Sequence, residues 1–251
     1  MLEVSDLSKS FGGLKAVDGV DLKVSKGALF GILGPNGSGK TTLFNLLTGF
    51  LEPTGGRILL EGRDLARQSP ENIVRAGMAR TFQVVRFHKD STVRETVWAA
   101  QSSHLSLGGL FRTSRSPSQK GLAEEVDRIL EKTWLAPHAD RLARELPFGL
   151  VRQLEIARAL ATRPRILLMD EPASGMNPSE THQLSEDIRR LRDGGLTIVL
   201  IEHDIEMVLG LCERIAVLNF GRKIAEGSAE EVKNDPDVIA AYLGTRKRAR
   251  A

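Results

Sequence analysis

Short apolar runs recur along the chain, and each is closed by glycine, proline or an acidic residue. Three of these runs have the length and aliphatic content of buried strands: 28–33 (ALFGIL), 165–170 (RILLMD) and 197–203 (TIVLIEH). Stretches with helical spacing lie at 40–48, 180–192 and 204–211. This alternation of strands and helices predicts an α/β fold with a mainly parallel core sheet.

Both ends of the chain add strand-like segments of another kind. Residues 3–24 and 55–65 are interrupted by glycine and aspartate, which predicts a small N-terminal antiparallel β subdomain. Residues 214–227 (RIAVLNFGRKIAEG) predict a late hairpin that turns at Phe220 and Gly221.

The middle of the chain has a helical pattern, so we expect an inserted helical subdomain at 86–160. Within it, residues 102–121 are rich in serine, glycine and arginine, which predicts a flexible loop or insertion. The core then comprises 1–85 and 161–251, and we expect the whole chain, 1–251, to form a single domain. The basic end, 245–251, is expected to be a solvated tail, and weak attraction to a membrane surface is the alternative.

Composition narrows the possible classes of protein. With 41% hydrophobic and 27% charged residues, the chain of 251 residues is an ordinary globular protein. A net charge of +3 is too small to indicate a nucleic-acid partner. Its one cysteine, Cys212, and the lack of an apolar leader favour a reducing compartment. No apolar run approaches the roughly 20 residues of a membrane span, so we expect any membrane role to act through a partner.

The most specific motif is GPNGSGKT, which lies between the first buried run and a helical stretch. Gly34, Gly37 and Gly39 let the backbone turn its N–H groups toward phosphate oxygens. Lys40 can reach the β and γ phosphates, and the Thr41 hydroxyl can bind Mg²⁺. A glycine-rich turn without a ligand is the alternative, but the placement between strand and helix favours a phosphate-binding loop.

An acidic pair, Asp170 and Glu171, ends the second buried run. Asp170 can hold Mg²⁺, and Glu171 can orient or deprotonate an attacking water. Acids after a strand are also common as helix caps or turn residues. The phosphate-binding loop makes the catalytic interpretation the better one.

The order of motifs resembles that of ABC transporter ATP-binding subunits over nearly the whole chain. GPNGSGKTT is similar to their Walker A motif, ARTFQ to the Q-loop, RILLMDE to Walker B, SGMNP to the D-loop and LIEHD to the switch region. The resemblance implies a P-loop NTPase fold of ABC type that binds ATP and Mg²⁺. The implied Walker A ligands are Gly34, Pro35, Asn36, Gly37, Ser38, Gly39, Lys40, Thr41 and Thr42.

Three further residues take roles from this resemblance. Phe11 would stack on adenine, although a core aromatic is the alternative. Gln83 would reach Mg²⁺ or the water and report to the membrane partner, unless it is an ordinary surface glutamine. His203 would hydrogen-bond the γ-phosphate, the alternative being a structural histidine.

The signature motif of the family, a Leu-Ser-Gly-Gly-Gln run, corresponds here to LPFGL at 146–150. Pro147 brings neither a serine hydroxyl nor an N–H, and Leu150 lacks the glutamine amide. The backbone amides of Phe148 and Gly149 at a helix start would therefore contact the ATP of a partner copy.

Finer similarity is to the ATPase subunits of branched-chain amino-acid and amide importers, in FGGLKAVDGVDL, LEIARAL and NDPDVIAAYLG. It implies a second ATPase subunit, identical or different, transmembrane permeases, an indirect link to a periplasmic solute-binding protein, and a peripheral position at the cytoplasmic face of the membrane. The alternatives are the ATPase of an exporter or a lipopolysaccharide-extraction system, a soluble non-transport ABC ATPase, and, least favoured, a P-loop kinase.

Overall fold

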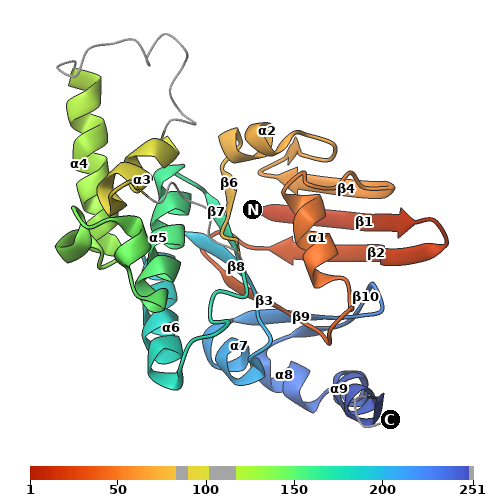
Figure 1. Ribbon diagram of the computed structural model, residues 1–251. Coiled ribbons are helices and arrows are strands. Elements are labelled where there is room, and N and C mark those ends of the chain that lie inside the picture. The colour runs from red at the N-terminus through yellow and green to blue at the C-terminus, as the bar shows by residue number, and fades with distance from the viewer. Residues whose placement is uncertain (83–89, 102–116, 249–251) are drawn as a thin grey trace.

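The computed structural model describes residues 1–82, 90–101 and 117–248 (Figure 1). The strands are β1 (Leu2–Phe11), β2 (Leu14–Val24), β3 (Leu29–Leu33), β4 (Gly55–Leu60), β5 (Arg63–Asp64), β6 (Met78–Arg80), β7 (Ile166–Asp170), β8 (Thr197–Ile201), β9 (Arg214–Asn219) and β10 (Arg222–Gly227). The helices are α1 (Lys40–Leu47), α2 (Pro70–Arg75), α3 (Val93–Ala100), α4 (Pro117–Lys132), α5 (Phe148–Ala161), α6 (Pro178–Asp193), α7 (Ile205–Leu211), α8 (Ala229–Asn234) and α9 (Pro236–Arg248). Two short 3-10 helices, η2 (Ala136–His138) and η3 (Ala143–Glu145), precede α5.

The main sheet has the strand order β10-β9-β3-β8-β7-β6 in the described residues. Its neighbouring strands are parallel, except that β10 runs antiparallel to β9. Every residue of β3, β7 and β8 is buried, because helices or the second sheet cover both faces. The predicted parallel core sheet and the late hairpin are therefore confirmed.

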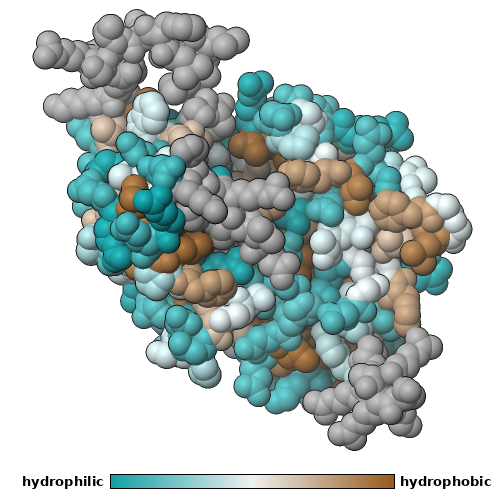
Figure 2. Space-filling model, viewed as in Figure 1, coloured by the Kyte–Doolittle hydropathy of each residue, from teal (hydrophilic) through white to brown (hydrophobic). Residues whose placement is uncertain are grey.

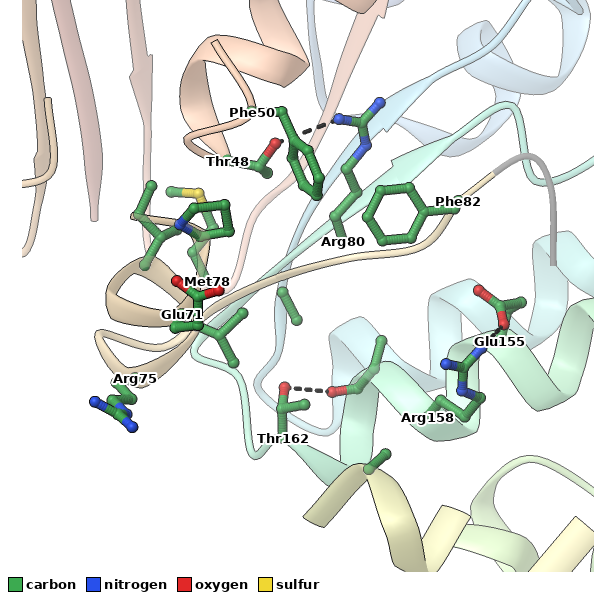
Figure 3. Close-up of a pocket in the computed structure, with 16 residues that line it drawn as sticks. Thr48, Phe50, Glu71, Arg75, Met78, Arg80, Phe82, Glu155, Arg158 and Thr162 are labelled. Carbon is green, nitrogen blue, oxygen red and sulfur yellow. Dashed lines mark hydrogen bonds and ion pairs between the residues drawn. The ribbon is translucent and has the colours of Figure 1, made fainter. Parts of the chain in front are cut away.

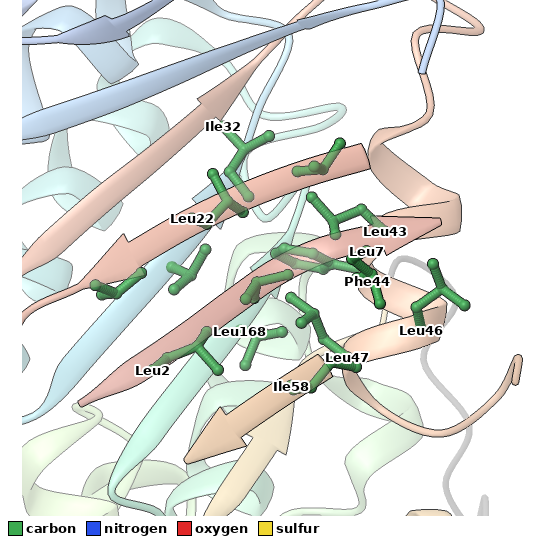
Figure 4. Packing of buried hydrophobic residues seen from close by; sticks show 14 of the residues in the cluster. Leu2, Leu7, Leu22, Ile32, Leu43, Phe44, Leu46, Leu47, Ile58 and Leu168 are labelled. Atoms are coloured by element: carbon green, nitrogen blue, oxygen red, sulfur yellow. The ribbon is translucent and has the colours of Figure 1, made fainter. Parts of the chain in front are cut away.

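The second sheet is antiparallel, with the order β2-β1-β4-β5, which confirms the predicted N-terminal β subdomain. A first hydrophobic core fills the space between this sheet, α1 and one face of the main sheet (Figure 4). It joins Phe44 and Leu47 of α1 to Leu7 of β1 and to Ile32 of β3. The first helix is thus held on two sides, which fixes the loop that precedes it.

The other face of the main sheet packs against α6 and α7 (Figure 1). Alternate residues of the strands point to this side, and Leu29 and Met169 join Ile188 of α6 and Val208 of α7 in a second core. Each of the two helices begins at a side-chain cap. The cap is Asn177 for α6 and Asp204 for α7.

A third core lies among α3, α4 and α5, which form a group beside the main sheet (Figure 1). The third core contains Val97 of α3, Ile129 of α4 and Leu154 of α5. Helix α5 also contributes Ile156 to the second core, so it connects the helical group with the main sheet. The division at 86–160 stays a prediction.

The loop that the sequence predicts at 102–121 extends too far at its C-terminal end. Helix α4 begins at Pro117, so residues 117–121 are helical, and residues 102–116 lie outside the described part of the chain. Proline suits a first helical turn because its missing N–H has no partner there in any helix. The serine- and glycine-rich composition of PSQKG concealed this helix start.

None of the helices in the described ranges is long and apolar enough to cross a membrane. Figure 2 shows that hydrophilic side chains dominate this face of the molecule and that hydrophobic ones lie in small groups between them. Phe50 and Phe82 are exposed and pack edge to face, with 5.6 Å between their ring centroids.

Candidate functional site

The candidate site lies at the carboxyl ends of three neighbouring strands, β3, β8 and β7. The phosphate-binding loop follows β3, the acidic pair ends β7, and His203 follows β8. Segments more than 100 residues apart in the sequence thus meet at one edge of the sheet. Ligands of open α/β sheets bind at such an edge.

The loop between β3 and α1 depends on glycine at its two ends. Gly39 has a φ of 103°, and a Cβ atom there would lie 2.4 Å from the carbonyl oxygen of Ala16 in β2. A Cβ atom on Gly34 would lie 2.3 Å from the carbonyl oxygen of Leu218 in β9. Both contacts are closer than a Cβ atom tolerates, so the loop can only close with glycine at these positions.

Lys40, the first residue of α1, folds back over this loop. Its ammonium group donates hydrogen bonds to the carbonyl oxygens of Gly34, at 2.6 Å, and Pro35, at 3.0 Å. Burial lowers the pKa of Lys40, and the nearby carboxylates of Glu171 and Asp170 oppose that shift. A buried cation beside two acids and the loop is a suitable group to meet phosphate.

The remaining loop residues divide into exposed and buried ones. Asn36, Gly37 and Thr41 are exposed, whereas Ser38 is buried. The Ser38 hydroxyl oxygen has no hydrogen-bond partner within the described chain. A buried hydroxyl without a partner is costly, so a phosphate oxygen at this place would satisfy it. Thr42 is half-buried, one residue further along α1.

The acidic pair has two different environments. Asp170 is the last residue of β7 and is buried. Glu171 has a positive φ of 49°, and its N–H donates to the carbonyl oxygen of Ile201 at 2.8 Å. This left-handed turn directs the Glu171 side chain to His203, whose Nε2 contacts the Glu171 Oε1. The structure therefore brings two of the three candidate catalytic residues, Glu171 and His203, into direct contact.

Asp170 has a partner that the motifs do not indicate. Arg80, at the end of β6, places its Nη2 2.5 Å from the Asp170 Oδ2. The two side chains are only 7% and 10% exposed. The only feature of the sequence that could have indicated this partner is that a basic residue, Arg80, stands three positions before Gln83.

Glu202 is a second residue that sequence reasoning missed. It is buried beside His203 and accepts hydrogen bonds from the N–H groups of Ala173, at 2.6 Å, and His203, at 3.1 Å. Burial raises the pKa of Glu202, and the two backbone hydrogen bonds oppose the shift. Glu202 thus ties the segment after Glu171 to the segment that carries His203.

Phe11 is placed at the end of β1, next to the turn into β2. Its side chain is 48% exposed, and the Lys9 ammonium lies 5.2 Å from the ring centroid. Ala16, on the strand after this turn, contacts Gly39 of the phosphate-binding loop. The ring is therefore outside the core and on the hairpin that borders the loop. Gln83 lies outside the described residues.

The stretch 146–150 starts helix α5 at Phe148, with Pro147 as the residue before it. Among the described residues, no side chain caps this helix end. Phe148 is 48% exposed and contacts Arg152, and the space beside Gly149 is bordered by Glu180. These neighbours belong to α5 and α6, and the Phe148 ring also borders Gly175 in the loop that follows Glu171. None of these neighbours belongs to the phosphate-binding loop of the same chain.

A groove of about 410 Å³ lies between α2 and the segment after α1 on one side and α5 and the end of α3 on the other, with β6 along it (Figure 3). Its lining is mostly apolar and includes Phe50, Met78, Phe82 and Ala159. Arg80 lies between the two labelled phenylalanines in this view. Phe82, which lines the groove, is the last described residue before the expected Q-loop glutamine.

Comparisons with known proteins agree with this geometry. Residues 17–174 match the family model described as "ABC transporter", and residues 222–248 match the model described as "Branched-chain amino acid ATP-binding cassette transporter". The chain is 46% identical, over 97% of its length and 98% of the relative, to the high-affinity branched-chain amino acid transport ATP-binding protein BraF of Pseudomonas aeruginosa. It is 45% identical, with the same coverage, to LivG of Escherichia coli K12, which has the same description.

Solved structures show the same fold. The crystal structure of a nucleotide-free ATP-binding cassette from an ABC transporter superposes with a TM-score of 0.85 at 37% identity, covering 96% of this chain and 98% of the other. The ADP conformation of an ATP-binding cassette superposes with a TM-score of 0.86 at 36% identity, covering 97% and 98%. This chain belongs to the ABC transporter ATP-binding family and is an ABC ATPase.

Proposed function

We propose that the chain hydrolyses ATP to power a membrane importer of branched-chain amino acids or related amino acids and amides. The substrate class comes from the descriptions of BraF and LivG and from the family model that matches residues 222–248. The proposal that the chain hydrolyses ATP depends mainly on one observation. Glu171 and His203 contact each other at the strand ends that also carry the phosphate-binding loop.

In this proposal the loop holds the phosphates of ATP. The N–H groups from Gly34 to Thr42, except at Pro35, which has none, surround them. Lys40 adds a positive charge, the Ser38 hydroxyl gains a partner and Phe11 stacks on adenine. The oxygen donors Thr41 and Asp170, joined by Gln83, suit Mg²⁺, which prefers oxygen ligands and keeps several waters. When bound, the ion neutralises charge on the phosphates.

Glu171 then orients and deprotonates the attacking water, and His203 holds the Glu171 carboxylate and the γ-phosphate. His203 Nε2 is placed at Glu171 Oε1, where a proton can pass between the water, the carboxylate and the imidazole. Glu202 keeps the backbone of His203 in place through its hydrogen bond.

The same cassette acts as a pair with a second ATPase subunit, a copy or a homologue. The start of α5 offers the amides of Phe148 and Gly149 to the ATP of the partner, and no described side chain competes for them. A helix N-terminus attracts anions. ATP binding then closes the pair, and hydrolysis reopens it.

The permease subunits bind in the groove that Phe50, Met78 and Phe82 line. Exposed aromatic side chains in a concave apolar surface are typical of a contact with another protein. The subunit is then peripheral, at the cytoplasmic face of the membrane, with an indirect link to a periplasmic solute-binding protein and no nucleic-acid partner.

Uptake of radiolabelled leucine by cells that lack their own branched-chain amino-acid ATPase tests this function. The chain is expressed with the permeases and binding protein from the same genome, and Glu171→Gln serves as the inactive control. We expect uptake with the wild type alone. ATP hydrolysis without uptake of leucine, isoleucine or valine would contradict the proposed substrate class.

A further inference from the structure

Arg80 and Asp170 lie side by side because β6 and β7 are parallel neighbours in the main sheet. Arg80 pairs with Leu168 in the register, two residues before Asp170. Its guanidinium therefore reaches along β7 to the carboxylate, with 2.5 Å between Nη2 and Oδ2. Both side chains are largely removed from water, so each needs the other's charge.

The guanidinium is also held from other directions. Its Nη1 donates to the Asn45 Oδ1 at 2.7 Å and to the Thr48 Oγ1 at 3.3 Å, both near the end of α1. The rings of Phe44 and Phe82 lie 5.6 Å and 5.2 Å from its central carbon. These contacts aim the cation at the end of β7, where the strand delivers the acid.

Asp170 is the acid that the proposed function assigns to Mg²⁺. A metal ion at the Asp170 carboxylate would lie close to the guanidinium that holds Oδ2 at 2.5 Å, and two cations on one carboxylate repel each other. The Arg80 Nε is buried and has no partner in the described chain, which shows that the present arrangement leaves a hydrogen-bonding group unsatisfied.

We propose that Arg80 is the counter-ion of Asp170 and competes there with Mg²⁺. Arg80 is then a positioning residue that holds the metal-binding acid until Mg·ATP arrives. This inference rests on the proposed roles of ATP and Mg²⁺. It adds a residue, and a form of regulation, to the same site.

An Arg80 side chain that is released from Asp170 would remain at the groove described above. The side chain lines the groove between Phe50 and Phe82 (Figure 3), so a guanidinium that leaves Asp170 stays beside the groove and its aromatic rings. Occupancy of the metal site is thereby coupled to the surface assigned to the permease. A partner that draws Arg80 toward the groove then strengthens Mg²⁺ binding. By linkage, Mg²⁺ strengthens the binding of that partner by the same factor.

A structural ion pair is the competing interpretation. Such a pair would stabilise the fold but would leave the contribution of Mg²⁺ to nucleotide binding unchanged. The quantity that separates the two is a ratio: the Kd of trinitrophenyl-ATP measured in EDTA divided by its Kd in saturating Mg²⁺. A general loss of nucleotide affinity changes both constants and cancels in this ratio.

The ratio is measured by fluorescence on the isolated full-length subunit, for the wild type and for Arg80→Gln. We expect it to rise roughly tenfold in the variant, since the ion no longer displaces a charged hydrogen bond. Arg165→Gln is the matched control, because it removes the same charge from an ion pair with Glu61 away from the loop. We expect the control to keep the wild-type ratio.

An unchanged or lower ratio in Arg80→Gln would overturn the proposal. If that variant does not fold, Arg80→Lys decides the question. Lysine keeps the charge but makes fewer fixed hydrogen bonds, so its ratio should exceed that of the wild type, and an unchanged or lower value would again overturn the proposal. Leucine uptake is measured separately, so loss of the transport function and loss of this competition give different results.

Discussion

The imidazole Nε2 of His203 contacts the Oε1 of Glu171 across the ends of two adjacent strands. The two residues are 32 positions apart in the sequence, and they meet because β7 and β8 are parallel neighbours with Asp170 beside Ile201. A carboxylate and an imidazole in contact can exchange a proton and orient a water. This pair leads to the first prediction.

Glu171→Gln should lower steady-state ATP hydrolysis about 100-fold or more while ATP still binds, because the amide cannot accept the proton of the water. ATP binding by fluorescence and phosphate release are the two measurements. Glu206→Gln, on the exposed first turn of α7, is the control and should behave as the wild type. Wild-type hydrolysis in Glu171→Gln would remove this residue from its assigned role.

Pro147→Ser should strengthen ATP-driven pairing and also stabilise α5. No described side chain caps this helix, and a serine hydroxyl can accept from its first turn or donate to phosphate. We expect a gain of about 1 kcal/mol in the free energy of unfolding without nucleotide. The phosphate contact should add about 1.5–3 kcal/mol to dimerisation, seen by sedimentation of the Glu171→Gln background with ATP. Equal dimerisation with and without the serine would show that the hydroxyl has no role at the phosphate.

Glu202→Ala should destabilise the protein by about 1–3 kcal/mol, mainly because the buried N–H group of Ala173 loses its acceptor, and the part-buried N–H group of His203 adds less. Denaturant unfolding measures this loss. Hydrolysis should fall as well, because the backbone of His203 loses its anchor. Glu206→Ala is the matched control, since its side chain is exposed. A stability equal to that of the control would mean that water replaces the carboxylate.

The stability of the hairpin formed by β9 and β10 should depend on pH through Glu226. Burial opposes its ionisation, but hydrogen bonds from Lys223, at 2.6 Å, and Arg214, at 2.7 Å, outweigh burial and lower the pKa of Glu226 below 4.5. The stability that this carboxylate contributes is present above pH 4.5 and is lost as the pH falls through its lowered pKa. The wild type should therefore exceed Glu226→Gln in the free energy of unfolding most above pH 4.5, and the difference should shrink toward lower pH. A constant difference would contradict the assignment.

Motif positions could be predicted because each depends on local chain geometry. Glycine at 34 and 39, with a strand before and a helix after, already describes a turn that only glycine closes. Predictions failed where composition concealed a helix, as at 117–121, which α4 includes. The roles assigned to Phe11 and Gln83 stay predictions, and Gln83 lies outside the described residues.

Partners across the sheet could not be predicted. Arg80 and Asp170 are 90 residues apart, and no periodicity in either segment indicates the other. Their contact depends on β6 being the neighbour of β7 in the main sheet, and this pairing is a property of the tertiary structure. Glu202 was overlooked for a similar reason. Its carboxylate accepts a hydrogen bond from the N–H group of Ala173, and this contact exists only because the fold places Ala173 beside the end of β8.

By itself the sequence determined the fold class, the family and the place of each motif, because strand and helix periods and glycine-dependent turns are local properties of the chain. Only the tertiary structure decided which charges meet. The order of the strands brings Arg80 to Asp170, where burial would make either charge costly without the other, and it brings His203 to Glu171.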